Sequence, residues 1–520
     1  MATNLVAVGN QAPGFYGLNL QQSSTVLDPQ WASEANNAVI TSDGRVGARM
    51  GFVKKSTIAG TIRTLHEVIT TTGTSAMVAA TDSKIYYAVA PYTTFTNIYS
   101  TTITNNNWQM TNFNGHVYMF QNGEFPLVYD VTSGVIEKLS AHTTHGAFTD
   151  SSDAVIATIK PDCVHSAFGR LWVGGSSTPA NGSKIWWCDS LNAENWGGGS
   201  AGALDLQTVL TGGTDYVTAI SSFQDYLIIF CKNSILMYSG ANSTPSSNLL
   251  LVEHIRGIGC IARDSVRNIG TDILFLSSSG VKSFNRIVQE KSAPIRDVSQ
   301  NVRDYLGAFS QAATVANIKS TYNPHEGFYL LSFPDNNKVF CFDLRAPLPD
   351  GSARATTWDG INPTAMVTLS NYSTYFGRTT DVGLYDSYVD DGSSYTFTYS
   401  TPWLDYGQEF NIKMLKNFYI LGEAGNSKNI TISWATDFKE SYSSVTKTSD
   451  ASGTVAEYST VVGVAGQYGI SEYGYGYNIS TLQGTLSKSG KTVKMKVTVP
   501  VDSRFNMKKY EIYAKVGRIV

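Results

Sequence analysis

Residues that could do chemistry are scattered through this 520-residue chain. His142 and His145 are three positions apart, so a helix would bring their imidazoles together. They lie in a Thr-rich stretch and lack a third ligand, which argues against a metal site. Carboxylate pairs such as Asp390-Asp391 have the composition of turns, and no zinc-protease H-E-x-x-H motif occurs. These patterns predict that the protein is not an enzyme and that it binds no cofactor or metal.

Cysteine and tryptophan residues support the same interpretation. The five cysteines stand at wide spacings without any C-x-x-C pair. This arrangement favours buried free thiols over a zinc or redox site. Trp186 and Trp187 are adjacent on an expected strand, so their side chains point to opposite faces. We therefore expect core or interface contacts for this pair rather than stacking on sugars.

Charge and composition exclude further classes of protein. Charged residues make up only 15% of the chain, and the formal net charge is −3. A protein that grips nucleic acid through a general basic field would be far more positive, although a channel through which DNA slides remains compatible. The N-terminus lacks the features of a secretory signal, and no apolar run reaches the ~18 residues of a membrane helix. We expect synthesis and folding in a reducing cytoplasm.

Between Thr61 and Asp390, groups of three or four short strands recur. Several contain an aromatic residue, a tight polar turn and then an apolar strand, as in TNFNGHVYMF, SAFGRLWVGG and SSFQDYLIIF. A period of about 40 to 55 residues with four strands per unit is typical of a β-propeller. The sequence thus predicts an all-β fold with a propeller over residues 61–390, of about seven blades within a range of six to eight. Ordinary β-sandwiches are the alternative.

Three segments interrupt this rhythm, and one region follows it. Apolar residues at helical spacing predict a helix over Asp297–Leu306. Residues 140–159 and 192–216 are long and poor in strand signals, which is typical of functional or disordered loops. After Asp390, alternating strands such as Ile430–Trp434 predict a half-exposed antiparallel sheet. We expect a C-terminal β-sandwich over residues 391–520.

The first 60 residues form an expected docking segment. Asp28-Pro29 has the pattern of a helix start, since Asp caps well and Pro suits the first helical position. Trp31 and the alanines after it predict a short helix of about two turns. Asp43-Gly44 between extended runs predicts a hairpin. Arg45 and Arg49 are an even number of positions apart, so they share one face, and we expect them at charged outer positions.

This opening segment resembles the start of tail hub or nozzle proteins of short-tailed bacteriophages, also called tail tubular protein B or packaged-DNA stabilisation proteins. A second patch near the C-terminus resembles the same family. The matching residues are Gly17-Leu18-Asn19, Pro29, Trp31, Asn36-Asn37, Gly44-Arg45, Arg49-Met50-Gly51-Phe52, Phe418–Phe438 and Glu472-Tyr473-Gly474. The resemblance covers about a fifth of the chain, and in the middle only the rhythm of strands matches.

The resemblance implies a structural virion protein in the phage tail. In that family six copies form a ring below the portal and adaptor proteins, and the lumen continues the DNA path, retaining the genome until ejection. Tail fibres are a further expected partner. The alternative is a lectin-like propeller that binds host-surface polysaccharide.

Two sets of residues are expected to carry this function. The first would dock the adaptor ring or a neighbouring subunit, and the second would narrow the lumen as a gate. The docking candidates are Trp31, Arg45, Arg49 and Phe52, and the gate candidates are His142, His145, Trp196, Leu204 and Leu206.

Overall fold

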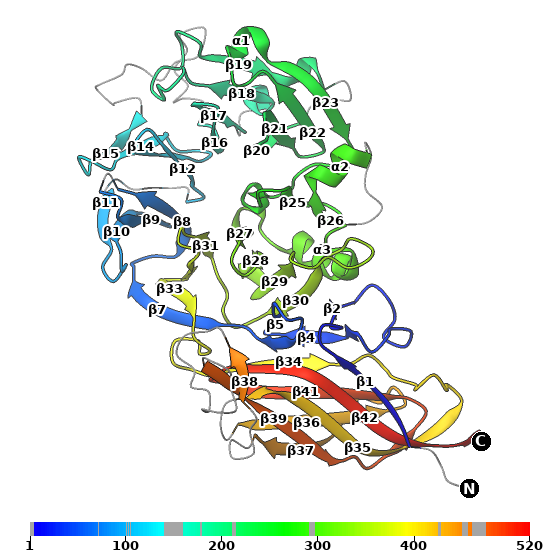
Figure 1. The fold of residues 1–520 in the computed structure, drawn as a ribbon. Helices are drawn as coiled ribbons and strands as arrows, with labels where there is room; N and C mark the ends of the chain where they lie inside the picture. The colour runs from blue at the N-terminus through cyan, green and yellow to red at the C-terminus, as the bar shows by residue number, and fades with distance from the viewer. Residues whose placement is uncertain are drawn as a thin grey trace.

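The structure is a computed structural model that describes most of the chain. The described residues are 5–70, 72–99, 101, 103, 106–139, 160–176, 179–210, 215–290, 297–424, 428–449, 456–459 and 475–519. These residues fold mainly into β-strands, which confirms the predicted all-β class (Figure 1). No helix within them is long and apolar enough to cross a membrane.

Four antiparallel sheets of four strands follow one another in the first half of the chain, and we call them ring sheets 1 to 4. In each sheet, strands that are neighbours in sequence pair with one another. Their strands are β8 (Ile62–Ile69), β9 (Ser75–Thr81), β10 (Ile85–Val89), β11 (Thr96–Tyr99); β12 (Gln109–Phe113), β13 (His116–Phe120), β14 (Leu127–Asp130), β15 (Ile136–Lys138); β16 (Cys163–Ala167), β17 (Arg170–Gly174), β18 (Lys184–Trp187), β19 (Gly202–Asp205); and β20 (Val217–Phe223), β21 (Tyr226–Cys231), β22 (Ser234–Ser239), β23 (Leu250–Arg256).

Three more sheets, 5 to 7, complete the ring. Their strands are β24 (Arg267–Asn268), β25 (Ile273–Ser277), β26 (Gly280–Ser283); β27 (Lys319–Asn323), β28 (Phe328–Phe333), β29 (Lys338–Asp343), β30 (Arg354–Trp358); and β31 (Ala365–Thr368), β32 (Thr374–Arg378), β33 (Asp381–Asp386) with β7 (Gly51–Thr57). Strand β7 comes from the opening segment and pairs with β33, with Gly51 opposite Asp386. An early strand therefore completes the last sheet of the ring.

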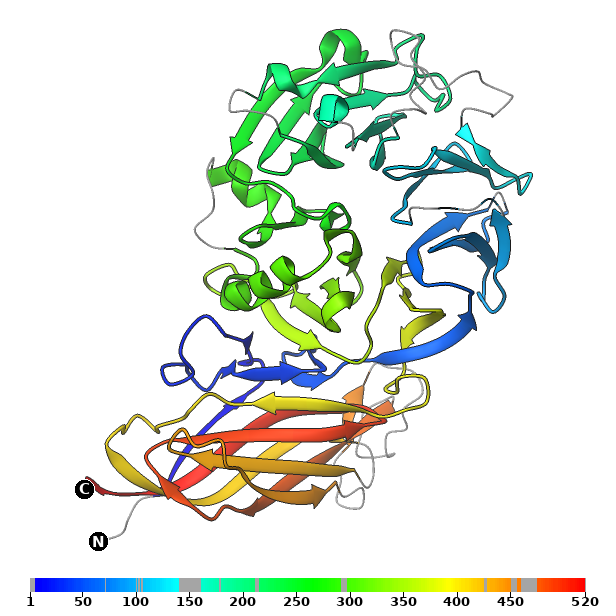
Figure 2. The ribbon, with the colours of Figure 1, turned by 180° about the vertical axis from the view of Figure 1, so that it is seen from behind.

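Apolar clusters between neighbouring sheets hold the ring together. Met77 packs with Tyr375 between sheets 1 and 7, whereas Val78 packs with Met119 between sheets 1 and 2. Successive side chains of a strand point to opposite faces, so each face of sheet 1 is buried by a different neighbour. The first strand of each sheet lies toward the centre of the ring and the last toward its outside (Figures 1 and 2). This arrangement confirms a β-propeller and excludes ordinary sandwiches for this region.

Helices are few and short: α1 (Pro245–Asn248), α2 (Phe284–Glu290) and α3 (Arg303–Ala312). The helix predicted over 297–306 begins later, with a 3-10 turn at Gln300–Val302 before α3. Asp297 and Ser299 are engaged elsewhere, because the Asp297 carboxylate binds Lys282 and the Ser299 hydroxyl accepts from the Val281 amide. These contacts tie the expected first turn to β26, and the helix starts beyond them.

Two layers of strands form the lower body in Figure 1. One has the order β37-β36-β41-β34-β4 and continues through the pairing of β4 with β30 into ring sheet 6, so the two form one 11-stranded sheet. The other has the order β38-β39-β35-β42-β6-β5, with β1 also on β42. Val497 and Ile512 belong to one apolar core that both layers share. Their strands are β1 (Leu5–Gln11), β34 (Tyr395–Ser400), β35 (Asn411–Ala424), β36 (Asn429–Thr436), β37 (Ser443–Thr448), β38 (Ala456–Ser459), β39 (Tyr475–Thr485), β40 (Ser489–Gly490), β41 (Val493–Val501) and β42 (Phe505–Ile519).

The opening segment is extended, and the helix predicted after Asp28-Pro29 is wrong. It contains β2 (Gly17–Leu18), β3 (Trp31–Ala32), β4 (Glu34–Asn36), β5 (Ala38–Ile40) and β6 (Val46–Ala48). A single turn forms where the Trp31 amide donates to the Asp28 carbonyl. Pairing of β3 with β2 and of β4 with β30 and β34 then outweighs a helix too short to be stable by itself. The predicted hairpin is confirmed, since β5 pairs with β6.

Candidate functional site

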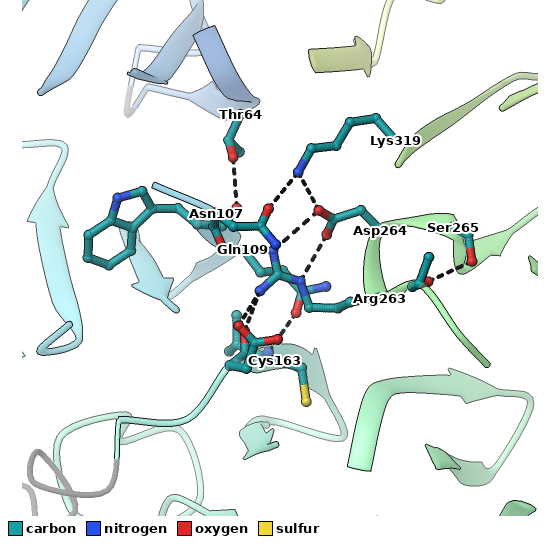
Figure 3. A network of polar contacts seen from close by, with 12 residues as sticks. Thr64, Asn107, Gln109, Cys163, Arg263, Asp264, Ser265 and Lys319 are labelled. Atoms are coloured by element: carbon teal, nitrogen blue, oxygen red, sulfur yellow. Dashed lines mark hydrogen bonds and ion pairs between the residues drawn. The ribbon is translucent and has the colours of Figure 1, made fainter. Parts of the chain in front are cut away.

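A cluster of charged side chains lies where the inner strands of several ring sheets begin (Figure 3). We call Asn107, Asp162, Arg263, Asp264 and Lys319 the axial cluster. Asn107 and Asp162 precede the first strands of sheets 2 and 3, and Lys319 is the first residue of β27 in sheet 6. Arg263 and Asp264 lie in a 3-10 turn, Arg263–Ser265, just before β24 of sheet 5. The ring topology thus gathers residues that are far apart in sequence.

Arg263 is the centre of this cluster. Its Nη1 donates to the Asp162 carbonyl at 2.7 Å and to the Asp162 Oδ1 at 2.9 Å. Its Nη2 donates to the Asn107 carbonyl at 2.8 Å, and its Nε donates to the Asp264 Oδ1 at 3.0 Å. One guanidinium therefore connects sheets 2, 3 and 5 through charge-assisted hydrogen bonds.

Lys319 extends the network to sheet 6. Its Nζ donates to the Asp264 Oδ2 at 2.5 Å and to the Asn107 Oδ1 at 2.6 Å. Beside it, the Ser320 hydroxyl donates to the Asp264 carbonyl at 2.7 Å. The Asp264 carboxylate therefore bridges two cations from different sheets and holds their relative positions.

Burial and charge act against each other in this cluster. Burial alone would lower the pKa of Arg263, but the charges of Asp162 and Asp264 raise that pKa above its usual value. Burial would raise the pKa of Asp264, yet Arg263 and Lys319 depress it below its usual value. Burial lowers the pKa of Lys319, and Asp264 opposes the shift. Mutual pairing keeps Arg263 and Asp264 charged at neutral pH and unsuited to general acid–base catalysis.

A cavity of about 100 Å³ adjoins the cluster. Arg63, His66, Arg267, Lys319 and Asp264 contribute its titratable lining side chains. Burial lowers the pKa of His66, and the charge of Arg267 adds to this effect, so His66 is neutral at pH 7. The cavity therefore carries three lysine or arginine cations against one carboxylate.

Other chemistry-bearing groups are accounted for by packing. All five cysteines are buried free thiols, as predicted. Burial raises the pKa of Cys188 and Cys231 to about 12, so both remain protonated at neutral pH. Within the described ranges, no group of three or more His, Cys, Asp or Glu side chains is placed to hold a metal ion.

One motif of nucleophile type escaped the sequence analysis. Gly198-Gly199-Ser200-Ala201-Gly202 has the spacing G-x-S-x-G of a hydrolase nucleophile. That motif requires a strand before the serine and a helix after it, whereas here strand β19 follows directly. The Ser200 hydroxyl donates to the Asp189 carboxylate at 2.6 Å and not to a histidine. The geometry does not support a serine nucleophile.

The second polar network joins the ring to the lower body, and we call it the joint cluster: Asn37, Arg49, Asp359, Asp390 and Tyr395. Arg49 is 0% exposed and binds both carboxylate oxygens of Asp390, at 2.7 and 3.0 Å. It also donates to the Asn37 Oδ1 and to the carbonyls of Met50 and Asp359. These five bonds use all five N–H groups of its guanidinium.

The Arg49 guanidinium also lies over the Tyr395 ring, 4.0 Å from its centroid. Burial would lower the pKa of Arg49, but Asp390 raises that pKa above its usual value. The Asn37 amide nitrogen donates to the Asp359 carboxylate at 2.6 Å, and the Asp359 amide donates back to Asn37 Oδ1 at 3.0 Å. The joint cluster is fully connected.

The predicted docking residues are mostly internal. Arg45 is buried and pairs with Glu423 of β35, and Phe52 packs with Trp358 and Phe376 in a core between sheets 6 and 7. The expectation that Arg45 and Arg49 occupy charged outer positions is therefore wrong. Their strands are covered by the lower body and the ring, each of which supplies a carboxylate. Trp31 is half-buried, in edge-to-face contact with Tyr16.

The predicted gate residues divide into two groups. His142 and His145 lie outside the described residues. Trp196 packs in the core between sheets 2 and 3, where its Nε1 donates to the Ala193 carbonyl at 2.7 Å. Leu206 is buried between sheets 3 and 4, with Leu204 beside it. The segment expected to be poor in strands thus supplies β19 and core side chains.

Sequence reasoning missed the axial cluster. The signal was present but weak: Arg263-Asp264 stand just before the expected strand Val266–Ile269, and Lys319 lies within the expected strand Ala316–Tyr322, which begins at Lys319 in the structure. That charged residues at these positions lie near the ring axis can be inferred only when the register of the propeller strands is known. The spacing in sequence alone, more than fifty residues between Asp264 and Lys319, gives no indication of their contact.

Comparisons with known proteins leave the family open. No protein-family model matches the chain, and no curated protein matches it. Solved structures that it resembles include the computationally designed Ika8 protein, with 9% identity and a TM-score of 0.35 over 64% of this chain and 99% of that one. The WD40 domain of Pan2 from Neurospora crassa has 9% identity and a TM-score of 0.40, over 66% of this chain and 98% of its own. Likeness at this level carries no functional argument.

Proposed function

We propose that this protein is a structural subunit of the tail hub or nozzle of a short-tailed bacteriophage. Six copies would form a ring below the adaptor and portal proteins, and the ring would retain packaged DNA and pass it during ejection. The protein would be made and assembled in the host cytoplasm and would reside in the virion tail. Its role is mechanical and needs neither catalysis nor a cofactor.

One observation carries this proposal: the two sequence patches that resemble the family contact each other. Arg45 of the opening patch forms an ion pair with Glu423 of the C-terminal patch. The Asn506 amide, from the strand between β6 and β35, donates to the other oxygen of Glu423 at 2.8 Å. Patches that are far apart in sequence thus form one structural unit, which is the expected result if they resemble one family for a common reason.

The ring and lower body suit a load-bearing subunit. We interpret the seven ring sheets as seven blades, with sheet 5 reduced to three strands, and the lower body as a β-sandwich. The joint cluster connects the two, and all five N–H groups of Arg49 are used within it. Buried, fully paired polar networks favour one fixed arrangement of their partners. A subunit that withstands the pressure of packaged DNA needs such a fixed arrangement.

The outer strand of sheet 4 offers a contact surface for a neighbouring copy. Leu250, Leu251 and Val252 are successive residues of β23 and all are exposed. Strand β23 lies at the edge of its sheet, where backbone groups are open to another chain. An exposed apolar run on an edge strand favours burial against a partner. It supports side-by-side packing of copies in a ring.

Deleting the gene from the phage genome that encodes it tests this function. We expect particles whose heads fill but do not retain DNA, with normal particles restored by the wild-type gene in trans. Particles that keep their DNA and eject it normally would refute the proposal.

A lectin-like propeller is the second candidate, favoured by exposed aromatic side chains at turns. Tyr372 is 56% exposed at a positive φ, and Phe410 and Phe438 are 68% and 56% exposed. Aromatic rings on exposed turns can stack on sugars. A monomer that binds host polysaccharide, and loses that binding with Tyr372→Ala, would favour this function over the tail ring.

A further inference from the structure

The cavity beside the axial cluster carries an excess of positive charge. Its lining includes the cations of Arg63, Arg267 and Lys319 but only one carboxylate, Asp264. That carboxylate is already shared by Arg263 and Lys319. The remaining lining residues are neutral at pH 7. Arg63 is paired with Asp82 outside the lining, and Lys319 is paired with Asp264, so Arg267 is the lining cation that has no carboxylate in ion-pair contact among the described residues.

Arg267 is the source of the excess. Its Nε and Nη2 donate to the Ser320 carbonyl at 3.1 and 2.8 Å, and its Nε also reaches the Ser320 hydroxyl at 3.1 Å. In the part of the chain that the structure describes, no carboxylate lies within ion-pair distance of Arg267, and its Nη1 donates no hydrogen bond. Burial lowers the pKa of Arg267, and the charge of Asp264 opposes this shift without an ion-pair contact.

Arg63, like Arg267, has only some of its N–H donors engaged. Its Nε pairs with Asp82 at 2.9 Å and its Nη1 donates to Asn317 at 3.1 Å, which leaves the Nη2 donors. Both arginines are only partly buried. A partly buried cation without an anion in contact is still disfavoured, and proteins usually supply the missing charge from a side chain or a ligand. Here two guanidinium groups with spare donors line one small space.

The size of the cavity limits the ligand. A single water needs roughly 10–15 Å³ of such space, and drug-sized ligands occupy pockets of about 300–1,000 Å³. A cavity of about 100 Å³ holds a few waters or one small ion. A whole nucleotide or sugar exceeds this volume.

We propose that this axial cavity binds a small tetrahedral oxyanion, inorganic phosphate or sulfate, through the guanidinium groups of Arg267 and Arg63 with Lys319 nearby. Guanidinium forks match the oxygen spacing of phosphate, and burial strengthens each charge-assisted hydrogen bond. His66 adds a neutral ring nitrogen to the same lining. The bound anion would connect sheets 1, 5 and 6 across the ring axis. This inference holds for a single chain and does not depend on the proposed tail function.

Calorimetric titration of the full chain with inorganic phosphate, at constant ionic strength, tests the proposal. We expect one saturable site per chain, and affinity at least tenfold weaker in Arg267→Gln. Glutamine keeps an N–H that can donate to the Ser320 carbonyl, so the contact between β24 and β27 is retained. Lys232→Gln removes the same charge from an exposed turn and is expected to leave phosphate binding unchanged.

Competition experiments distinguish a free inorganic anion from the phosphate of a nucleotide or nucleic acid. Sulfate should compete with phosphate, whereas AMP and a ten-residue oligothymidylate should not, because each as a whole exceeds the volume of the cavity, about 100 Å³. Competition by the oligonucleotide would show that nucleic-acid phosphates are the ligand and would overturn the proposal. So would the absence of saturable binding to the wild type, or equal affinity in Arg267→Gln. If that variant fails to fold, Arg63→Gln decides: weaker binding is expected, and unchanged binding overturns the proposal.

Discussion

Arg49 of the joint cluster and Arg267 beside the axial cluster are both arginines at crossings between sheets, but their surroundings differ. Arg49 uses all five N–H groups and holds both oxygens of one carboxylate. Among the described residues, Arg267 donates hydrogen bonds only to Ser320, and it lines a cavity. The donors of Arg49 are all satisfied by the chain itself, whereas Arg267 keeps donors that a ligand could use. Full pairing thus distinguishes a structural joint from a place where a ligand can enter.

The comparison also explains where rigidity is needed. The joint cluster fixes the ring on the lower body, and its five members come from three segments: the opening hairpin and its flanks, the end of β30, and the residues after β33. The axial cluster fixes the inner ends of ring sheets against one another.

Removing the Arg49 side chain should have the largest effect. Arg49→Met leaves the Asp390 carboxylate without its cation, and we expect the free energy of unfolding to fall by about 3–5 kcal/mol. Urea unfolding measures the loss. Lys54→Met is the matched control, since Lys54 pairs with Asp381 on the surface of β7 and should cost less than about 1 kcal/mol. Equal losses of stability in the two variants would contradict the greater importance of the buried Arg49–Asp390 pair.

Asp264→Asn should lower the free energy of unfolding by a smaller amount, about 2 kcal/mol. Arg263 keeps Asp162 as a counter-ion, and the adjoining cavity can admit water or an anion to the exposed charge. Phosphate should therefore restore part of the thermal stability lost in this variant, more than it stabilises Lys54→Met. Thermal melts of both variants with and without phosphate make the comparison. Equal shifts of the melting temperature in the two variants would refute the prediction.

The pH dependence should isolate the same carboxyl group. Burial acts to raise the pKa of Asp264, but Arg263 and Lys319 hold it below its usual value of about 3.9. Its contribution to stability is therefore present above about pH 4 and is lost as the pH falls toward the folded-state pKa.

Unfolding in urea at pH 6, 4 and 3 checks this sign. The difference in stability between wild type and Asp264→Asn should shrink as the pH falls below 4, because other carboxyl groups titrate alike in both proteins. A difference that stays constant down to pH 3 would contradict the assignment.

Trp31→Ala should have the smallest effect on folding. Trp31 is half-buried and contacts Tyr16 at the edge, so its loss should cost about 1 kcal/mol. If the exposed part of Trp31 contacts the adaptor or a neighbouring copy, ring assembly should fall while the melting temperature changes little. Sedimentation velocity separates the assembled ring from single chains, and unchanged assembly would exclude a docking role for Trp31.

Sequence reasoning predicts the repeating elements of this fold better than its connections. The apolar strands expected in SAFGRLWVGG and SSFQDYLIIF are observed as Arg170–Gly174 and Tyr226–Cys231, because alternation and tight turns are local signals. The helix at Asp28-Pro29 failed because β2, β30 and β34 offer backbone partners that no local pattern reveals. The closure of sheet 7 by β7 is equally non-local.

The candidate sites show the same limit. Arg49 is a prominent charged residue in sequence, and an exposed docking role follows only if no carboxylate covers it. Asp390, more than three hundred residues away, supplies that carboxylate. Arg263 and Lys319 were overlooked because their importance depends on the register of the ring. Chemistry that is assembled from distant strands cannot be read from spacing alone.

The most direct test of the central claim, that this chain is a ring-forming tail subunit, is its mass in solution. Mass photometry of the purified full chain, alone and mixed with a candidate phage tail adaptor protein, measures it. The account predicts a species of about six chain masses, either by itself or on the adaptor ring. A chain that stays monomeric under both conditions would contradict it.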